Sequence, residues 1–185
     1  MSDPAPYPPV SQAEQPNLHR RPSLHEPKKD GNYTSLIACF VLCFAVAAAA
    51  SAVTIPNLAP WYESLAKPGF TPANWVFGPV WAVLYALMAV SLWLAWTSPA
   101  ARSLKFPALF IFGVQLLLNA AWPLAFFGAQ SPGLALLVIL LLIISIAATI
   151  FSFYRIRALA SLLLVPYLAW ICYAGVLNLT IWWMN

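Results

Sequence analysis

Long stretches without a single charged side chain constrain this chain more than any other feature. Residues 33–55, 75–97, 106–127, 132–154 and 159–183 contain no Lys, Arg, Asp or Glu. A helix crosses the roughly 30 Å hydrocarbon core of a bilayer with about 20 mostly apolar residues, so each stretch is long enough to span it. The chain is 62% hydrophobic and 8% charged, whereas soluble domains carry about 25% charged residues. We therefore predict an all-α membrane protein, a bundle of five transmembrane helices.

The segment between the first two stretches, from Pro56 to Asn74, is polar and aromatic. It is too long for a minimal turn, and its aromatic side chains suit the membrane interface. We therefore expect a structured first loop. Glu63 and Lys67 stand four residues apart in this loop. That spacing predicts an ordinary surface ion pair, worth well under about 1 kcal/mol.

Prolines mark where several of the predicted helices begin or bend. Pro107 and Pro132 suit first helical turns, where the missing N–H costs no hydrogen bond. Ser131 is placed to accept a hydrogen bond from an unpaired backbone N–H at the start of the fourth helix. Pro123 and Pro166 fall inside apolar stretches. A proline there removes a backbone hydrogen bond, so we expect a kink near Pro123 and a bend near Pro166.

Residues 1–32 differ in composition from the rest of the chain. They carry seven prolines among polar residues, namely Pro4, Pro6, Pro8, Pro9, Pro16, Pro22 and Pro27. Such a segment contains too little apolar material to offset the entropy lost on ordering. We therefore expect a disordered, proline-rich tail, followed by one five-helix domain over residues 33–185.

The basic residues outside the predicted spans are unevenly distributed. With five crossings, one side of the membrane holds Arg20, Arg21, Lys28, Lys29, Arg102, Lys105, Arg155 and Arg157. The other side holds only Lys67. The positive-inside rule then predicts a cytoplasmic N-terminus and a C-terminus on the opposite side. As a separate expectation, we favour a bacterial cell membrane over an organelle membrane. Because these residues do not gather on one face, they are interpreted as topology signals, and no nucleic-acid partner is predicted.

Neutral polar and aromatic side chains share one face on each of three helices. Spacings of three or four residues align Trp81 with Tyr85 and Met88, Gln115 with Asn119 and Trp122, and Trp170 with Ala174 and Asn178. One interpretation is an interior cavity in which aromatic faces hold a large apolar ligand and amides orient its polar edge. The other is helix packing, because Asn and Gln side chains also form hydrogen bonds between helices. Spacing alone favours packing and leaves the cavity open.

Several function classes find no support in the residues. The spans lack the intramembrane charges that usually mark an ion or proton pathway. No paired carboxylates, Ser/His/Asp arrangement or phosphate loop indicates a catalytic site. Cys39, Cys43 and Cys172 have neither the paired spacing of a zinc site nor the even count of a disulfide framework, and are interpreted as packing residues. We predict no metal site and no obligatory cofactor.

Several multi-residue motifs follow one another along the chain. They are Trp61-Tyr62-Glu63-Ser64-Leu65-Ala66-Lys67-Pro68, Pro72-Ala73-Asn74-Trp75, Pro79-Val80-Trp81, Leu84-Tyr85, Gln115-Leu116 with Asn119, Trp122-Pro123, Phe126-Phe127-Gly128-Ala129, Pro166-Tyr167-Leu168-Ala169-Trp170 and Leu177-Asn178. In this order and spacing they resemble the TspO/translocator protein family, formerly called the peripheral benzodiazepine receptors. The resemblance covers residues 36–183 and excludes the tail.

The resemblance implies a five-helix bundle, commonly a homodimer in membrane lipid, whose first loop covers a pocket for porphyrins, sterols and synthetic ligands. It makes the cavity the favoured interpretation of the aromatic faces. By position it implies ligand contacts at Tyr62, Pro72, Trp81, Tyr85, Gln115, Asn119, Trp122, Trp170, Ala174 and Leu177. The implied function is binding of a tetrapyrrole, either a porphyrin or haem, by a membrane sensor, regulator or carrier.

Two other functions remain open at this point. Some members of the family degrade porphyrin under light with tryptophans implicated, and Trp81 and Trp170 are the matching positions. The other alternative is a membrane scaffold, or a sterol-binding or lipid-binding transporter subunit.

The chain departs from the family pattern at two places. The family's Pro-Pro-Arg-Trp has Asn74 at the arginine position, which leaves Lys67 as the only cation expected in the lid over the pocket. The cholesterol motif of animal members has a tyrosine and an arginine where this chain has Leu179 and Trp183.

Overall fold

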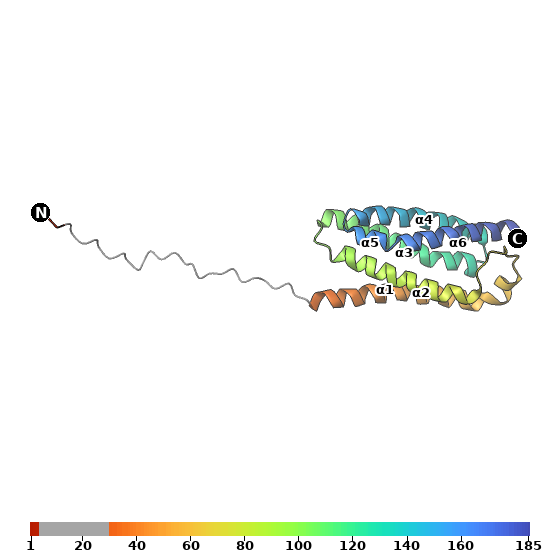
Figure 1. The fold of residues 1–185 in the computed structure, drawn as a ribbon. Coiled ribbons are helices and arrows are strands. Elements are labelled where there is room, and N and C mark those ends of the chain that lie inside the picture. The colour runs from red at the N-terminus through yellow and green to blue at the C-terminus, as the bar shows by residue number, and fades with distance from the viewer. Residues whose placement is uncertain (4–29) are drawn as a thin grey trace.

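The five predicted spans are present in a computed structural model that describes residues 1–3 and 30–185. The long helices are α1 (Asp30–Thr54), α2 (Asn74–Trp96), α3 (Arg102–Pro123) and α4 (Pro132–Tyr154), and the last span consists of α5 (Ala158–Leu162) and α6 (Val165–Met184). All of them run along one common axis (Figure 1). The fold is therefore the all-helical membrane bundle that the sequence predicts. Most of the predicted tail, residues 4–29, lies outside the described residues.

The two ends of the bundle carry different residues. The first loop and the C-terminus lie at one end, and α1 and α3 begin at the other (Figure 1). Arg102 and Lys105 at the start of α3, and Arg155 and Arg157 after α4, therefore belong to the end opposite the first loop. The charge asymmetry of the sequence becomes a basic end of the bundle, and its assignment to the cytoplasm stays a prediction.

Helix α3 begins four residues earlier than expected. Arg102 and Lys105 lie in its first turn, and Pro107 follows in the second turn, so the prediction that Pro107 opens the helix is wrong. The extension brings Lys105 to the end of α2, where its Nζ donates to the backbone oxygens of Trp96 at 3.2 Å and Ser98 at 3.0 Å. A cation is favourable at this helix C-terminus because the last carbonyls there have no partner within the helix.

The predicted kink near Pro123 is a change in helix winding. Beyond Pro123 the backbone continues as a wider π-helical turn, η4 (Leu124–Gly128). Pro123 has no N–H to donate to the turn before it, so the regular α-helical pattern weakens there. After a short turn, the Ser131 hydroxyl accepts a hydrogen bond from the Leu134 N–H at 3.3 Å, which confirms the predicted cap of α4.

The predicted bend near Pro166 is a break between α5 and α6. Leu163 and Leu164 separate the two helices, and Pro166 lies in the first turn of α6. Because Pro166 cannot donate to the carbonyl oxygen of Leu162, the helical hydrogen bonds are interrupted one turn before the proline. The last span is therefore two helices separated by a short interruption.

The core of the bundle comes from side chains between neighbouring helices. Helix α1 packs on α2, α3 packs on α4, and α4 also packs on α5 and α6. Phe112 of α3 and Phe153 of α4 stack with ring centroids 5.7 Å apart, and both rings are buried. Cys39 and Cys43 are buried in the same core, as predicted, whereas Cys172 is exposed, so the packing interpretation is wrong for that cysteine.

Candidate functional site

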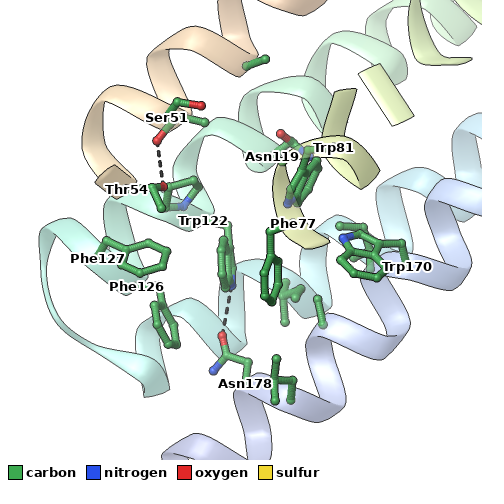
Figure 2. Close-up of a pocket in the computed structure, with 18 of the residues that line it drawn as sticks. Ser51, Thr54, Phe77, Trp81, Asn119, Trp122, Phe126, Phe127, Trp170 and Asn178 are labelled. Atoms are coloured by element: carbon green, nitrogen blue, oxygen red, sulfur yellow. Dashed lines mark hydrogen bonds between the residues drawn. The ribbon is translucent and has the colours of Figure 1, made fainter. Parts of the chain in front are cut away.

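A cavity of about 450 Å³ lies inside the bundle next to the first loop, between α1, α2, α3, α4 and α6. This volume falls within the range of about 300–1,000 Å³ typical of small-molecule sites. Its walls are largely aromatic, and Figure 2 shows Phe77, Trp81, Trp122 and Trp170 around one space. None of the residues found to line it, within the part of the chain that the structure describes, carries a charge. The cavity therefore suits a flat, mostly apolar molecule.

Most of the predicted ligand contacts meet at this cavity. Its lining includes Tyr62, Trp81, Tyr85, Asn119, Trp122, Trp170, Ala174 and Leu177. Pro72 and Gln115 do not line it: Pro72 is half-buried in the first loop, and Gln115 is buried within α3. The structure thus brings together side chains from three helices and the loop, and their contact with a ligand stays a prediction.

A chain of hydrogen bonds joins α2, α3 and α6 at the cavity wall. The Tyr85 hydroxyl donates to Asn119 Oδ1 at 2.5 Å, and Asn119 Nδ2 donates to the Tyr167 hydroxyl at 2.8 Å. All three side chains are buried. The Trp81 ring lies against Tyr85, with ring centroids 5.6 Å apart. Asn119 therefore holds three helices together and fixes the aromatic wall beside it.

A second amide, Asn178 of α6, makes a similar link nearer the loop. Its Oδ1 accepts a hydrogen bond from Trp122 Nε1 at 3.0 Å (Figure 2), and its Nδ2 donates to the Pro132 carbonyl at 2.7 Å. These bonds connect α3, α4 and α6. Helix packing and a cavity are therefore compatible interpretations of these helix faces. The amides form hydrogen bonds between helices, and the aromatic rings beside them line the cavity.

Gln115 lies one turn before Asn119 on α3 and behaves differently. Its side chain is 1% exposed, and neither Nε2 nor Oε1 has a hydrogen-bond partner among the described residues. A buried amide without partners costs free energy, because it has lost its hydrogen bonds to water. Gln115 therefore differs from the buried amides of Asn119 and Asn178, which form hydrogen bonds with neighbouring helices.

The first loop closes one end of the cavity. It continues α1 through a 3-10 turn, η2 (Ile55–Asn57), and a π-helical segment, η3 (Leu58–Tyr62), which contains a kink. At its end the Tyr62 ring is 6% exposed and packs against Phe126 and Phe127, at centroid distances of 6.3 and 5.7 Å. The loop is thus a folded lid with an aromatic inner side, as the sequence predicts.

Lys67 stabilises the lid itself. Its Nζ donates to the backbone oxygens of Tyr62, Glu63 and Leu65 at 2.7, 3.2 and 3.1 Å, and lies 4.7 Å from the centre of the Tyr62 ring. The predicted ion pair with the Glu63 carboxylate is wrong, because the ammonium group binds carbonyl oxygens at the end of a helical turn. The expectation that Lys67 offers a cation to the ligand is also unsupported, since its three donors are all in use.

Two contacts tie the lid to α6. Asn185 pairs with the backbone of Ala66, accepting from its N–H at 3.0 Å and donating to its carbonyl oxygen at 3.1 Å. The Tyr173 hydroxyl donates to the carbonyl oxygen of Phe70 at 2.7 Å, and the two rings are 6.5 Å apart. The lid is therefore attached to the same helix that carries Trp170 on the cavity wall.

The cavity also reaches the outside of the bundle between two helices. Ser51 of α1 and Gly78 and Ala82 of α2 line it, and all three are exposed. Their side chains are small, so the wall is thin at this place.

Some lining residues were missed by the sequence reasoning. Phe77 lies one helical turn before Trp81, so the four-residue spacing could have found it. Phe126 and Phe127 belong to a quoted motif but were given no role in the site. Ile139 and Leu142 come from α4, which is apolar all round and shows no distinguishing pattern.

Comparison with known proteins identifies the family to which the chain belongs. The sequence pattern of the TspO/MBR family matches residues 39–184. The chain is 39% identical to the tryptophan-rich protein TspO of Archaeoglobus fulgidus over 83% of this chain and 99% of that protein. It is 42% identical to the human translocator protein over 66% and 73%, and 35% identical to the tryptophan-rich sensory protein of Cereibacter sphaeroides over 74% and 85% of the respective chains. With its five helices and its tryptophan-lined cavity, this chain belongs to the TspO/MBR family.

Proposed function

We propose that this protein binds a tetrapyrrole, such as a porphyrin, in the cavity beneath the first loop and acts as a membrane sensor, regulator or carrier. One observation carries the proposal: aromatic rings from α2, α3 and α6 surround an uncharged space inside a membrane bundle. Aromatic pairs contribute about 0.5–1.5 kcal/mol each beyond the area they bury. Several rings acting on one flat macrocycle supply the affinity that a cavity without charges needs.

The polar groups of the site restrict how such a ligand lies. Asn119 and Asn178 already bond other helices, so the deep wall offers mainly apolar contacts. Asn74 lines the cavity and is exposed, which makes its amide a suitable donor to a porphyrin carboxylate at the surface. The described residues that line the cavity include no His, Cys or Met, so we expect recognition of the macrocycle itself, with or without iron.

The relatives support the choice of role. The names "tryptophan-rich sensory protein" and "translocator protein" belong to similar chains that cover most of this one. A sensor or carrier needs access for its ligand, and the thin wall at Ser51, Gly78 and Ala82 provides a route from lipid. We propose that the protein works in the membrane as a homodimer, which size measurements in lipid nanodiscs can check.

A fluorescence titration tests this function. Protoporphyrin added to the full chain in detergent should quench tryptophan emission with saturation. Trp81→Leu and Trp170→Leu should each weaken binding about tenfold, the equivalent of about 1.4 kcal/mol of lost ring contact. The matched control is Trp183→Phe, because Trp183 is 86% exposed and does not line the cavity. Quenching that does not saturate, or equal affinity in the wild type and the three variants, would show that the aromatic faces of the helices serve only packing.

A light-dependent degradation of porphyrin is the second candidate, favoured by the position of two tryptophans. Trp81 and Trp170 both line the cavity, on α2 and α6. We expect illuminated wild-type protein to consume bound porphyrin faster than the Trp81→Phe and Trp170→Phe variants at equal occupancy. The same products at the same rate in all three proteins would exclude a catalytic role and leave binding intact.

A further inference from the structure

A second hollow, of about 370 Å³, lies between α1, α2 and α3 at the end of the bundle away from the first loop. One face of each helix lines it, and apart from Ser35 its lining is apolar. On α3 the lining runs from Leu109 to Leu116, a distance of seven residue steps or about 10 Å at 1.5 Å per residue. This length is about a third of the hydrocarbon core, so the hollow accommodates the upper part of one acyl chain.

The face of α3 that lines this hollow continues into the basic end of the bundle. Arg102, Lys105, Leu109, Phe112 and Leu116 follow one another at alternating spacings of three and four residues, which place them in one line along the helix. The last three line the hollow, and the first two lie beyond its mouth. An apolar groove thus leads directly to two cations.

The charges at this mouth suit an anion. Lys105 donates to two backbone oxygens, at Trp96 and Ser98, and an ammonium group has three N–H donors. Arg102 is exposed in the first turn of α3, whose N-terminus has no side-chain cap. Unpaired backbone N–H groups at such a terminus also favour a phosphate. Within residues 30–185, the only acidic residue that begins or ends a helix at this end is Asp30.

We propose that this hollow is a binding site for an anionic phospholipid, with one acyl chain between α1, α2 and α3 and the phosphate held by Arg102 and Lys105. A neutral lipid fills the groove equally well but carries no net charge to meet the two cations. Anionic lipids concentrate where basic residues flank a membrane span, and each basic residue contributes to their attraction. The site is separate from the aromatic cavity, since the two hollows share no lining residue.

Native mass spectrometry of the full chain in detergent tests the site, with phosphatidylglycerol and phosphatidylcholine of equal acyl chains as probes. Phosphatidylglycerol should bind more tightly, and Arg102→Gln should lower its affinity about fivefold while leaving phosphatidylcholine unchanged. Gly113→Phe should weaken both lipids, because Gly113 lines the hollow and a Cβ there meets no atom within 4 Å. That variant should keep its response to protoporphyrin, which shows that the bundle is folded.

The matched control removes charge from the same end of the bundle but from another place. Arg155→Gln combined with Arg157→Gln should leave the affinity for phosphatidylglycerol within about twofold, since both residues follow α4, which contributes no residue to the lining of the hollow. Equal binding of the two lipids overturns the proposal. An equal loss of phosphatidylglycerol affinity in the Arg155→Gln and Arg157→Gln control also overturns it, because the attraction is then a general one between charges. Unchanged lipid binding by Gly113→Phe overturns it too, because the lipid then binds elsewhere.

Discussion

Two amides one turn apart on α3 should respond in opposite ways to the same substitution. Asn119→Leu removes the hydrogen bonds to Tyr85 and Tyr167 and leaves two buried hydroxyls without this partner. Side-chain hydrogen bonds between membrane helices contribute about 0.6 kcal/mol on average and up to about 1.7, so the loss of two predicts a destabilisation of about 1–3 kcal/mol. Gln115→Leu removes an amide that has no hydrogen-bond partner among residues 30–185, so its predicted effect lies between zero and a stabilisation of about 1 kcal/mol.

The measurement is the free energy of unfolding in mixed micelles, titrated with a denaturing detergent and followed by circular dichroism. Both substitutions introduce the same side chain at buried positions on the same helix, so each serves as the control for the other. A destabilisation above about 1 kcal/mol for Gln115→Leu would refute the reasoning. It would mean that Gln115 has a bonded partner, such as an internal water.

Two further predictions concern the cavity wall and the lid. Gly78→Leu should weaken protoporphyrin binding about tenfold with little effect on folding, because Gly78 lines the cavity and a Cβ there meets nothing within 4 Å; unchanged binding would place the ligand elsewhere. Lys67→Met keeps the side-chain stem but removes three hydrogen bonds to the lid backbone. Amide hydrogen exchange over residues 62–68 should become at least about tenfold faster, whereas Glu63→Gln, which alters no ion pair with Lys67, should leave it unchanged.

Local signals in the sequence predicted the five spans and several of their ends. Ser131 and Pro132 predicted the start of α4. The missing N–H of proline explains the change from α-helical to π-helical winding after Pro123 and the break before Pro166. These features depend on residues within one turn of each other, which is why a sequence shows them. The unexpected start of α3 depends instead on Lys105 reaching the end of α2.

The candidate site was predictable to a lesser extent. Spacing aligned the aromatic faces on α2, α3 and α6 but could not distinguish a cavity from packing. Only the resemblance to a family favoured the cavity. Spacing also suggested an ion pair for Lys67, although its partners are carbonyl oxygens whose positions depend on how the loop folds. The pairing of Asn185 with Ala66 joins residues 119 positions apart, a contact that no local pattern encodes.

The attachment of the lid to α6 has a mechanical consequence. Helix α6 begins at a break in the last span, next to Pro166, and carries Trp170 and Leu177 on the cavity wall. Because Asn185 and Tyr173 tie the lid to this helix, a swing of α6 about the break displaces the wall and the lid as one lever. A movement of α6 would therefore change the width of the cavity and the position of its cover together, with no unfolding of the lid.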